Sequence, residues 1–468
     1  MAGISSNIFR DIRFFILIWF LLHLVGITRP PIEPSHSWRQ AYTAMVAKNF
    51  YENGPNILYP EVDYMGPGRE VTASEFHFMT SLIWSVSNIF GYDHWYGRLI
   101  NLVFSTLGIW FFFLIIREWI GRREAFFSTV VLMVSTWFMF SRKIMPDTFS
   151  VSLVIIGIYF ALDYFRSGSW LSLFIYLLAG TLGVLNKIPS AVLLPVLIIP
   201  LVAGSFPLLR KVFFSIISLI IIAVAGIWYF HWVPHLIAEY NNPLYFPRSF
   251  AEGLAEIASH TGGSFEKFLF AALRSYAGFA IFLFGLILAI KEKNRILVFI
   301  FLSTLLLFLV FAVKAGIIFS THDYYIIPFV PVMALMAGFG LSKIKKPFLA
   351  YILLGIVTFE GTLNQYHDFF PGDANRYLLN LEQIGNKYSS EDDLFIVNGG
   401  LDPRLMYFLD REGWSIRNVD ACNPAVVDSL SARGAEFLLL DETKGACDVD
   451  WPPLYEDDDV VLYRLVLR

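Results

Sequence analysis

Long runs of apolar residues recur along most of the chain. A helix needs roughly 20 predominantly apolar residues to cross the hydrocarbon core of a bilayer. Apolar runs of suitable length lie at about 12–28, 96–116, 124–141, 147–165, 170–186, 189–206, 211–232, 272–290, 296–313, 324–342 and 347–364. The pattern predicts a polytopic α-helical membrane protein with about 11 transmembrane helices.

Lysine and arginine residues gather in alternate loops between these runs. The loops hold Arg10 and Arg13; Arg117, Arg122 and Arg123; Arg166; Arg210 and Lys211; Lys291, Lys293 and Arg295; and Lys343, Lys345 and Lys346. Because cytoplasmic loops carry the excess of positive charge, the N-terminus is predicted to be cytoplasmic. Residues 29–95, about 233–271 and everything after about 366 are then predicted to be external.

The first external loop, 29–95, has a pattern of its own. Ser37-Trp38-Arg39-Gln40 has the Ser-x-x-Gln form of a capping box, which marks the start of a helix. One helical face then carries Tyr42, Met45, Val46, Asn49 and Phe50. The pattern predicts an amphipathic helix lying against the membrane surface. A second apolar helix is predicted at about 74–90, after an extended loop at 60–64.

The C-terminal segment changes character. Leu394–Val397 and Glu436–Leu440 have the pattern of buried strands, and Arg404–Leu409 and Ala425–Ala432 that of helices. We therefore predict a small extracytoplasmic α/β domain at 367–468, after a membrane domain at 1–366 that includes the loop helices within 29–95. Gly399-Gly400 marks either a phosphate loop or, more commonly, a plain turn.

The two cysteines, Cys422 and Cys447, both fall in the predicted outer domain. An external compartment permits a disulfide bond. Two free buried thiols are the alternative, and the sequence does not test the geometry that a bridge requires.

Composition supports the membrane assignment. The 468 residues are 56% hydrophobic and only 16% charged, with a mean hydropathy of +0.59, whereas soluble domains carry about 25% charged residues. The net charge of −4 and the lack of a polybasic tail give no indication of nucleic-acid binding. No Asp-x-Asp or Cys/His cluster argues for a metal site, and no cofactor is predicted.

Several basic groups stand on the predicted external side, against the usual charge bias. They are Arg39, Arg142, Lys143, Lys187 and Lys314, the last with His322 and Tyr324 nearby in sequence. Cations at the external ends of membrane helices could bind the phosphate of a lipid-linked sugar. Cleaving a sugar from such a phosphate needs positive charge on the leaving group and a carboxylate that accepts a proton.

Each of these residues also has a structural explanation. Arg39 could extend toward lipid headgroups. Arg142 and Lys143 could be interfacial anchors neutralised by Asp147, which itself could cap the helix that begins at Pro146. Lys187 lies between two apolar runs, where a charge is costly unless it is paired.

The remaining candidates are equally open. Glu75 opens the second predicted loop helix, where the helix dipole favours a carboxylate. His322 and Tyr324 could belong to an interfacial aromatic belt or contact the donor directly.

These motifs together resemble the GT-C membrane glycosyltransferases. Within them the chain resembles the bacterial family 39 group, relatives of protein mannosyltransferases and of the aminoarabinose transferase acting on lipid A. The resemblance rests on Trp38–Ala41 through Ala47–Tyr51, Leu58–Asp63, Glu75-Phe76, Met145–Asp147, Asn186–Pro189, His322–Tyr325 with Pro328, and Tyr407 through Asp410–Trp414. It implies a polyprenyl-phosphate sugar donor and transfer on the extracytoplasmic face.

The chain departs from that family at one important position. Better-known members begin the first loop helix with an Asp-Glu pair, whose aspartate is the catalytic base. Here the same place reads His36-Ser37-Trp38-Arg39-Gln40, and a related branch commonly has an aspartate where this chain has Tyr42. Asp63 and Glu75 are therefore the predicted catalytic carboxylates. The resemblance assigns Arg39 and Lys187 to the phosphate. The other predicted substrate-binding residues are Gln40, Arg142, Lys143, Asp147, Lys314, His322 and Tyr324.

We therefore predict an integral-membrane glycosyltransferase of the cell envelope, in a bacterial or archaeal plasma membrane. It would transfer a hexosyl or pentosyl group to a hydroxyl of a lipid, glycan or protein, and its partners would include membrane lipids but no nucleic acid. A lipid-linked sugar transporter or flippase is one alternative, although internal repeats are not evident. A non-enzymatic scaffold is the other, but it would not need Lys187 or Arg142-Lys143.

Overall fold

The computed structural model describes residues 11–203, 205–244, 247–445, 447, 449 and 451–465. Within them the chain forms two compact units. Unit 1 consists of Met1–Ile27, Gly97–Trp232 and Tyr245–Phe369, and unit 2 of Thr28–Tyr96, Val233–Leu244 and Phe370–Arg468. The first loop, which the sequence analysis grouped with the membrane helices, thus shares a unit with the C-terminal segment.

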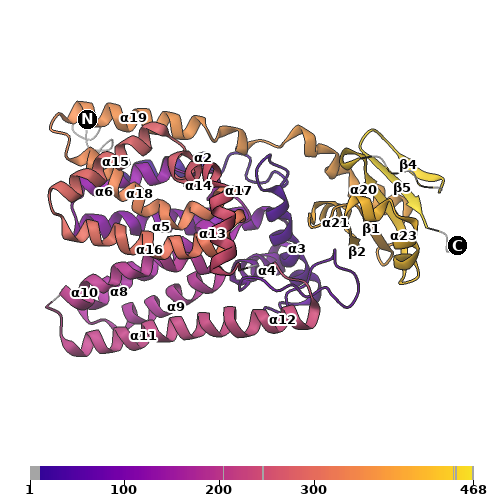
Figure 1. Cartoon of the computed structure of the whole chain (residues 1–468), viewed down its shortest axis with the longest axis horizontal. Coiled ribbons are helices and arrows are strands. Elements are labelled where there is room, and N and C mark those ends of the chain that lie inside the picture. Colours follow the sequence, from indigo (N-terminus) through magenta and orange to yellow (C-terminus); the bar gives the residue numbers. More distant parts are fainter. Residues whose placement is uncertain are drawn as a thin grey trace. The chain divides into compact units, whose positions relative to one another are not determined.

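Unit 1 is built from helices, drawn in Figure 1. They are α2 (Ile12–His23), α5 (Trp95–Trp119), α6 (Arg122–Val134), α7 (Trp137–Phe140), α8 (Pro146–Ser167), α9 (Trp170–Asn186), η1 (Ile188–Leu197), α10 (Ile198–Ala203), α11 (Leu208–Ile227), η2 (Trp228–Trp232), α13 (Phe250–Ser259), α14 (Thr261–Glu266), η3 (Lys267–Ala271), α15 (Tyr276–Lys291), α16 (Arg295–Ala315), α17 (Ile317–Thr321), η4 (Asp323–Phe329), α18 (Val330–Ser342), α19 (Pro347–Leu363) and η5 (Tyr366–Phe369).

Among the described residues, five helical stretches are long and apolar enough to cross a membrane, or up to seven if each of two bent pairs is one span. The five are Trp95–Trp119, Pro146–Ser167, Leu208–Tyr240, Arg295–Ala315 and Asp323–Ser342. Each apolar run of the sequence overlaps one or more helices of the structure. The protein is therefore a helical membrane protein, whereas the number of 11 spans stays a prediction.

Helices α8 and α9 form an antiparallel hairpin and lie side by side (Figure 1). Gly168 ends α8 with a left-handed φ of 75°, a conformation that glycine adopts without steric cost. Close contact follows from small residues: a Cβ atom at Gly183 would lie 2.9 Å from the Ser150 carbonyl oxygen. The hairpin thereby brings the end of α9 beside the start of α8.

Unit 2 contains the two predicted loop helices, α3 (Ser37–Asn53) and α4 (Phe78–Phe90). The predicted capping box at Ser37 is wrong. His36 is the N-cap, with a φ of 61° and no side-chain cap, because the Ser37 hydroxyl accepts a hydrogen bond from Arg404 and the Gln40 amide donates to Glu33. Glu75 also precedes α4 instead of opening it.

Helix α3 is not the amphipathic surface helix that the sequence predicted. Twelve of its 17 residues are buried, and they include polar ones such as Arg39, Gln40 and Asn49. Its apolar residues Met45 and Val46 share a core with Phe395 of the C-terminal segment. The helix is enclosed by other parts of the chain, so it has no broad polar face toward water.

The C-terminal segment forms a five-stranded sheet of order β2-β1-β3-β5-β4. The strands are β1 (Leu394–Val397), β2 (Gly413–Ser415), β3 (Ala435–Asp441), β4 (Pro453–Glu456) and β5 (Val460–Arg464). Strand β1 pairs in parallel with β2 and β3, and β5 pairs antiparallel with β3 and β4. The predicted strands at 394–397 and 436–440 are confirmed as β1 and β3.

Helices surround this sheet in the same segment. They are η6 (Asp373–Asn380), α20 (Leu381–Tyr388), α21 (Arg404–Leu409), α22 (Asn418–Ala421), α23 (Pro424–Ser431) and η7 (Glu442–Lys444), while α12 (Val233–Tyr240) belongs to the middle part of unit 2. The predicted helices at 404–409 and 425–432 are confirmed as α21 and α23. Gly399-Gly400 is a turn, in which the Gly400 N–H donates to the Ile416 carbonyl at 2.8 Å.

The first loop is joined to the outer edge of this sheet. The N–H groups of Gly413 and Ser415 in β2 donate to the carbonyls of Asp63 and Tyr64, both at 2.9 Å. Gly66 follows with a φ of 80°, and a Cβ there would lie 1.9 Å from the Trp414 indole nitrogen. The extended segment after α3 therefore acts as a further strand-like edge of the sheet.

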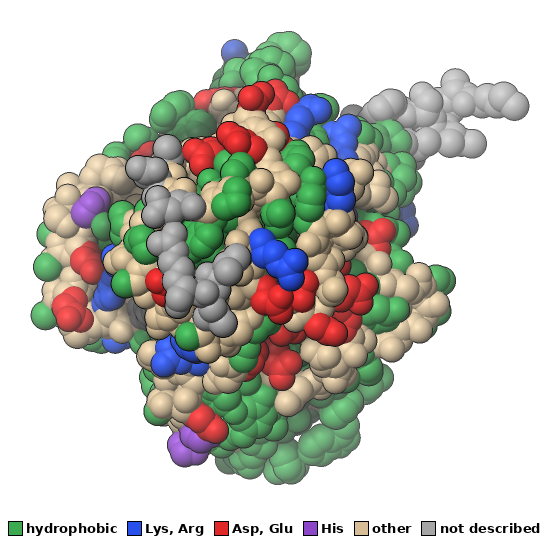
Figure 2. All heavy atoms as spheres, turned by 90° about the vertical axis from the view of Figure 1, so that its right-hand side faces the viewer, with side chains coloured by type: hydrophobic (Ala, Val, Ile, Leu, Met, Phe, Trp, Pro, Cys, Tyr) green, Lys and Arg blue, Asp and Glu red, His purple; other side chains and the backbone are tan. Residues whose placement is uncertain are grey.

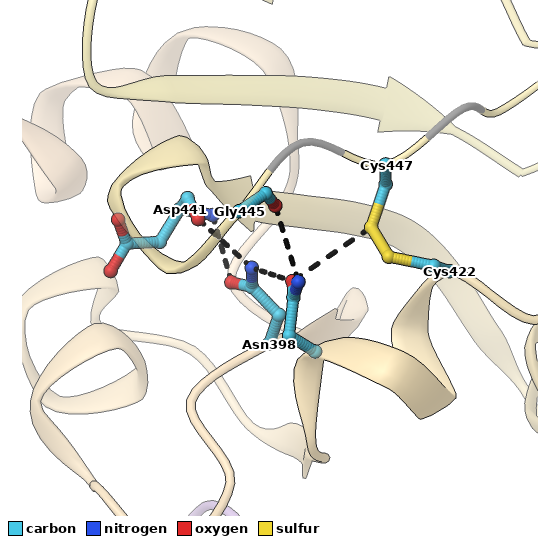
Figure 3. Close-up of a disulfide and its surroundings, with 6 residues drawn as sticks. Asn398, Cys422, Asp441, Gly445 and Cys447 are labelled. Carbon is cyan, nitrogen blue, oxygen red and sulfur yellow. Dashed lines mark hydrogen bonds between the residues drawn. A yellow bond between two sulfur atoms is a disulfide. The ribbon is translucent and has the colours of Figure 1, made fainter.

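Cys422 and Cys447 form a disulfide, so the alternative of two free thiols is not what the structure has. Figure 3 shows the surrounding hydrogen bonds, in which Asn398 contacts both Asn418 and Asp441. Figure 2 shows acidic side chains in several groups on the side of unit 2 that carries this segment. Residues 370–468 contain 19 acidic and nine basic residues.

Candidate functional site

A buried ion pair joins the start of α3 to the segment before α4. The Arg39 guanidinium pairs with the Glu75 carboxylate and also donates to Thr43 Oγ1 at 3.0 Å. Arg39 is 2% exposed, and the side chain of Glu75 is 15% exposed. Two charges taken out of water need such pairing to be tolerated. One predicted phosphate ligand and one predicted base thus lie together in unit 2.

Tyr42 lies one helical turn beyond Arg39. Its ring centroid is 4.8 Å from the Arg39 guanidinium carbon. Its hydroxyl donates to Ser74 Oγ at 3.0 Å and lies 3.1 Å from Thr72 Oγ1. This tyrosine occupies the position where a related branch of the family has an aspartate.

Gln40 has a partner that the sequence did not suggest. Its Nε2 donates to Glu33 Oε2 at 2.9 Å, and both side chains are buried. Glu33 is therefore held beside the first turn of α3, so its carboxylate is already engaged.

Asp63 contacts α3 nearer to the C-terminal end of the helix than Glu75 does. Asn49 Nδ2 donates to Asp63 Oδ1 at 2.6 Å. Residues 39 and 49 of one helix are about 15 Å apart along its axis, so the two predicted catalytic carboxylates contact opposite parts of α3. Burial raises the pKa of Asp63 to about 7, although the hydrogen bond from Asn49 opposes this shift.

Unit 1 holds a second buried pair of cation and carboxylate. Lys187 Nζ lies 3.7 Å from Asp147 Oδ1 and 5.5 Å from the centroid of the Tyr324 ring. Asn186 Nδ2 donates to Ser150 Oγ at 2.9 Å, which fixes the end of α9 against α8. The hairpin thus places Asp147 beside Lys187 and supplies the pairing that a charge between two apolar runs needs.

Asp147 does not cap α8 as expected. The N-cap is Met145, whose side chain makes no capping bond, and Asp147 lies in the first turn. Lys143 Nζ pairs with Asp368 at 3.3 Å, and Arg142 donates to the Gly26 carbonyl at 2.9 Å.

The side-chain amide of Asn101 makes several hydrogen bonds to the segment that carries Arg142 and Lys143. Asn101 Nδ2 donates to the carbonyls of Phe140, Lys143 and Met145 at 2.8–3.2 Å. Its Oδ1 accepts from Thr148 Oγ1 at 2.9 Å. Asn101 was not singled out by sequence reasoning because an isolated asparagine in an apolar run has no motif around it.

Lys314 and His322 make aromatic contacts and contacts with residues close to them in sequence. The Lys314 ammonium lies 5.6 Å from the Phe250 ring centroid. Within the described residues, no hydrogen bond or ion pair joins it to another predicted site residue. His322 Nδ1 lies 2.9 Å from Thr321 Oγ1, and its ring is 5.4 Å from that of Tyr324.

No cluster of three or more His, Cys, Asp or Glu side chains that could hold a metal ion is found in the described part of the chain.

Comparison with known proteins identifies the fold of the chain. Residues 78–230, about a third of the chain, match the family model described as dolichyl-phosphate-mannose-protein mannosyltransferase. The structure is similar to that of ArnT from Cupriavidus metallidurans, with a TM-score of 0.59 and 13% identity over 97% of this chain and 98% of ArnT. The chain has the GT-C fold.

Two further GT-C structures were solved with lipid phosphates. ArnT bound to undecaprenyl phosphate matches with a TM-score of 0.57 and 13% identity, over 96% of this chain and 98% of ArnT. AglB from Archaeoglobus fulgidus, in complex with an inhibitory peptide and a dolichol-phosphate, matches at 0.56 and 11%, over 92% of this chain and 70% of AglB. Among curated proteins, no sequence matches the chain.

The chain also contains two cations, Lys267 and Arg274, that sequence reasoning did not connect with Asp323. Asp323, next to the predicted site residues His322 and Tyr324, accepts from Lys267 Nζ at 2.5 Å and from Arg274 Nη2 at 2.7 Å. Lys267 falls in the second predicted external loop and Arg274 at the start of an apolar run. Their position beside the other external cations was a signal available from the sequence.

Proposed function

We propose that this protein is a membrane glycosyltransferase that moves a sugar from a polyprenyl phosphate to an acceptor hydroxyl. The observation that carries the proposal is the buried pair of Arg39 and Glu75 at the first turn of α3, in a chain with the GT-C fold. The pair supplies the two kinds of group that the reaction needs, a cation and a carboxylate.

The proposed reaction is a displacement at the anomeric carbon. The acceptor hydroxyl transfers its proton to the Glu75 carboxylate while its oxygen forms a bond to the anomeric carbon. The bond from that carbon to the phosphate oxygen breaks, and its electron pair leaves with the polyprenyl phosphate. Arg39 stabilises the negative charge on this leaving group. Lys187, in unit 1, is a separate candidate for binding a phosphate.

Glu75 is preferred over Asp63 as the base for two reasons. It contacts Arg39, which the proposal assigns to the phosphate. Asp63 contacts Asn49 instead, about 15 Å along α3 from Arg39, and its raised pKa of about 7 leaves it largely protonated in mildly acidic solution.

The other predicted site residues receive supporting roles in this proposal. Asp147 orients the Lys187 ammonium, and the Tyr324 ring covers it, as their contacts suggest. Gln40 and its partner Glu33 hold the first turn of α3. Arg142 and Lys143 contact the donor lipid near the membrane surface, and Lys314 and His322 border the same region.

The proposal extends to orientation and partners. The alternating Lys/Arg loops favour a cytoplasmic N-terminus and an active site and C-terminal domain on the extracytoplasmic face. The donor carries a hexose or pentose, and the acceptor is a lipid, glycan or protein. A lipid phosphate is bound by ArnT and AglB, which supports a donor of this chemical class.

The test is an assay of purified protein with polyprenyl-phosphate sugars and a panel of acceptor hydroxyls. A transferase releases polyprenyl phosphate and glycosylates an acceptor, whereas a flippase moves the donor across a vesicle membrane without releasing it. Loss of a general base typically lowers the rate by roughly 10²–10⁴. Glu75→Gln should therefore lower turnover by that order.

The matched control is Glu61→Gln, in the same loop. Glu61 is half-buried, and its carbonyl, which the substitution keeps, accepts from Asn49. Its turnover should stay near that of the native protein. Normal turnover in Glu75→Gln would exclude this residue as the base.

A further inference from the structure

Tyr42 contacts Arg39 through its ring, and its hydroxyl contacts the segment that carries Glu75. It is 1% exposed and sits three residues after Arg39, on the same face of α3. Its contacts indicate a role of its own.

The ring supports the arginine. The guanidinium carbon of Arg39 lies 4.8 Å from the ring centroid, within the distance at which a cation is attracted to an aromatic face. A planar guanidinium that rests on a ring loses little freedom when it binds an anion. The ring therefore fixes Arg39 before any ligand arrives.

The hydroxyl holds the segment that carries Glu75. It donates to Ser74 Oγ at 3.0 Å, and Ser74 Oγ lies 2.9 Å from His77 Nε2. Thr72 Oγ1 is 3.1 Å from the same hydroxyl. Glu75 thus lies between two residues, Ser74 and His77, that are tied to α3 through Tyr42.

Both ends of this chain of hydrogen bonds are neutral at physiological pH. Burial raises the pKa of Tyr42 to about 12 and lowers that of His77 to about 4. The tyrosine hydroxyl therefore keeps its proton, and the histidine does not add a positive charge beside Arg39.

We propose that Tyr42 is a positioning residue that sets Arg39 with its ring and Glu75 with its hydroxyl. The inference rests on the proposed function, because it assigns Arg39 to donor binding and Glu75 to turnover. It predicts that the two effects can be separated by substitutions at one position. A residue that only filled space in the core would not show this separation.

The experiment compares Tyr42→Phe with Tyr42→Leu in the full-length protein. The phenylalanine keeps the ring but loses the hydroxyl, so affinity for undecaprenyl phosphate should stay within about twofold while turnover falls by about tenfold or more. The leucine loses both groups, so affinity should also fall by about fivefold or more. These fold-changes correspond to about 1 kcal/mol, the usual size of one hydrogen bond or one cation–π contact.

Tyr64→Phe is the matched control. Tyr64 is a second buried tyrosine of the same core, and its variant should change neither affinity nor turnover. Equal losses of affinity in Tyr42→Phe and Tyr42→Leu would overturn the inference, as would normal turnover in Tyr42→Phe.

Failure of the proposed function has a different signature. If the native protein turns over no polyprenyl-phosphate sugar, the proposed function fails. The affinities of the two Tyr42 variants for undecaprenyl phosphate still test the ring, because equal affinities would overturn its role and a difference of about fivefold would support it.

Discussion

At the scale of residues, three cations of the predicted site contact a carboxylate of their own unit. Arg39 pairs with Glu75, Lys187 with Asp147 and Lys143 with Asp368. A buried charge without such a partner would cost several kcal/mol. The pairs keep the protein stable without substrate. A phosphate that binds one of these cations must therefore compete with, or join, a carboxylate already in place.

Asp63 is a half-buried carboxylate that forms no ion pair within the described residues, and this leads to a prediction about pH. Its pKa rises from an ordinary 3.8 to about 7 on folding, so the folded protein holds this proton where the unfolded chain has lost it. Stability attributable to Asp63 therefore falls as the pH rises from about 4 to about 7. Asp63→Asn should remove this decline, because an asparagine oxygen can still accept from Asn49.

The measurement is the melting temperature of both proteins between pH 5 and 8. The nearby Glu412, whose pKa burial also raises, titrates in both proteins and so cancels in the comparison. Parallel pH profiles for the two proteins would contradict the prediction.

At the scale of elements, the α8–α9 hairpin decides where Lys187 lies. The helices are in contact because glycine replaces larger side chains along their interface, and Lys187 follows directly after α9. The distance between Lys187 and Asp147 is therefore set by helix packing and not by the two side chains alone.

Gly183→Ala tests this dependence. An added Cβ would lie 2.8 Å from Val154 Cγ2 and 2.9 Å from the Ser150 carbonyl oxygen, so α9 must shift. Overpacking of this kind costs roughly 1–3 kcal/mol, and we expect lower thermal stability together with weaker donor binding.

The control for this variant is another helical glycine. A Cβ at Gly226 in α11 would meet no atom within 4 Å. Gly226→Ala should therefore leave donor binding unchanged and stabilise the helix by up to about 1 kcal/mol. Similar behaviour of the two variants would show that helix packing does not control the Lys187 site.

At the scale of the whole molecule, the first loop and the C-terminal segment share one hydrophobic core. Val62 and Phe50 of the loop cluster with Leu405 and Leu439 of the C-terminal segment. Arg404 adds hydrogen bonds to Ser37 Oγ at 3.1 Å and Asn375 Oδ1 at 2.8 Å. The C-terminal segment is therefore part of the structure that holds α3.

The disulfide should contribute to the stability of unit 2. It links residues 25 positions apart, and a loop of this size contributes roughly 3–4 kcal/mol in the chain-entropy model. Reductant should lower the melting temperature of the native protein and should not affect a Cys422→Ser, Cys447→Ser double variant. An unchanged melting temperature after verified reduction would contradict the prediction.

Much of this architecture followed from local sequence patterns. Apolar runs located the helices of unit 1, and two short apolar runs located β1 and β3. The pairing of Lys187 with Asp147 was also within reach, because a tight turn at Gly168 between two helices implies an antiparallel hairpin.

Other features could not follow from local patterns. Arg39 and Glu75 are 36 residues apart in an irregular loop, and their pairing depends on the whole fold of unit 2. The capping-box prediction failed because distant partners, Arg404 and Glu33, engage Ser37 and Gln40. Strand β2 has only three residues, too few for an alternating pattern.

The shared sheet edge at Asp63 and Tyr64 has a consequence for the time course of synthesis. The loop ends at residue 96, but the strand that receives it, β2, begins only at Gly413. At about 5–20 residues per second, the ribosome needs roughly 15–60 s to make the intervening chain. During that interval Met45 and Val46 of α3 lack the C-terminal residues with which they share a core, so cellular quality control has a window in which unfinished copies can be recognised and removed.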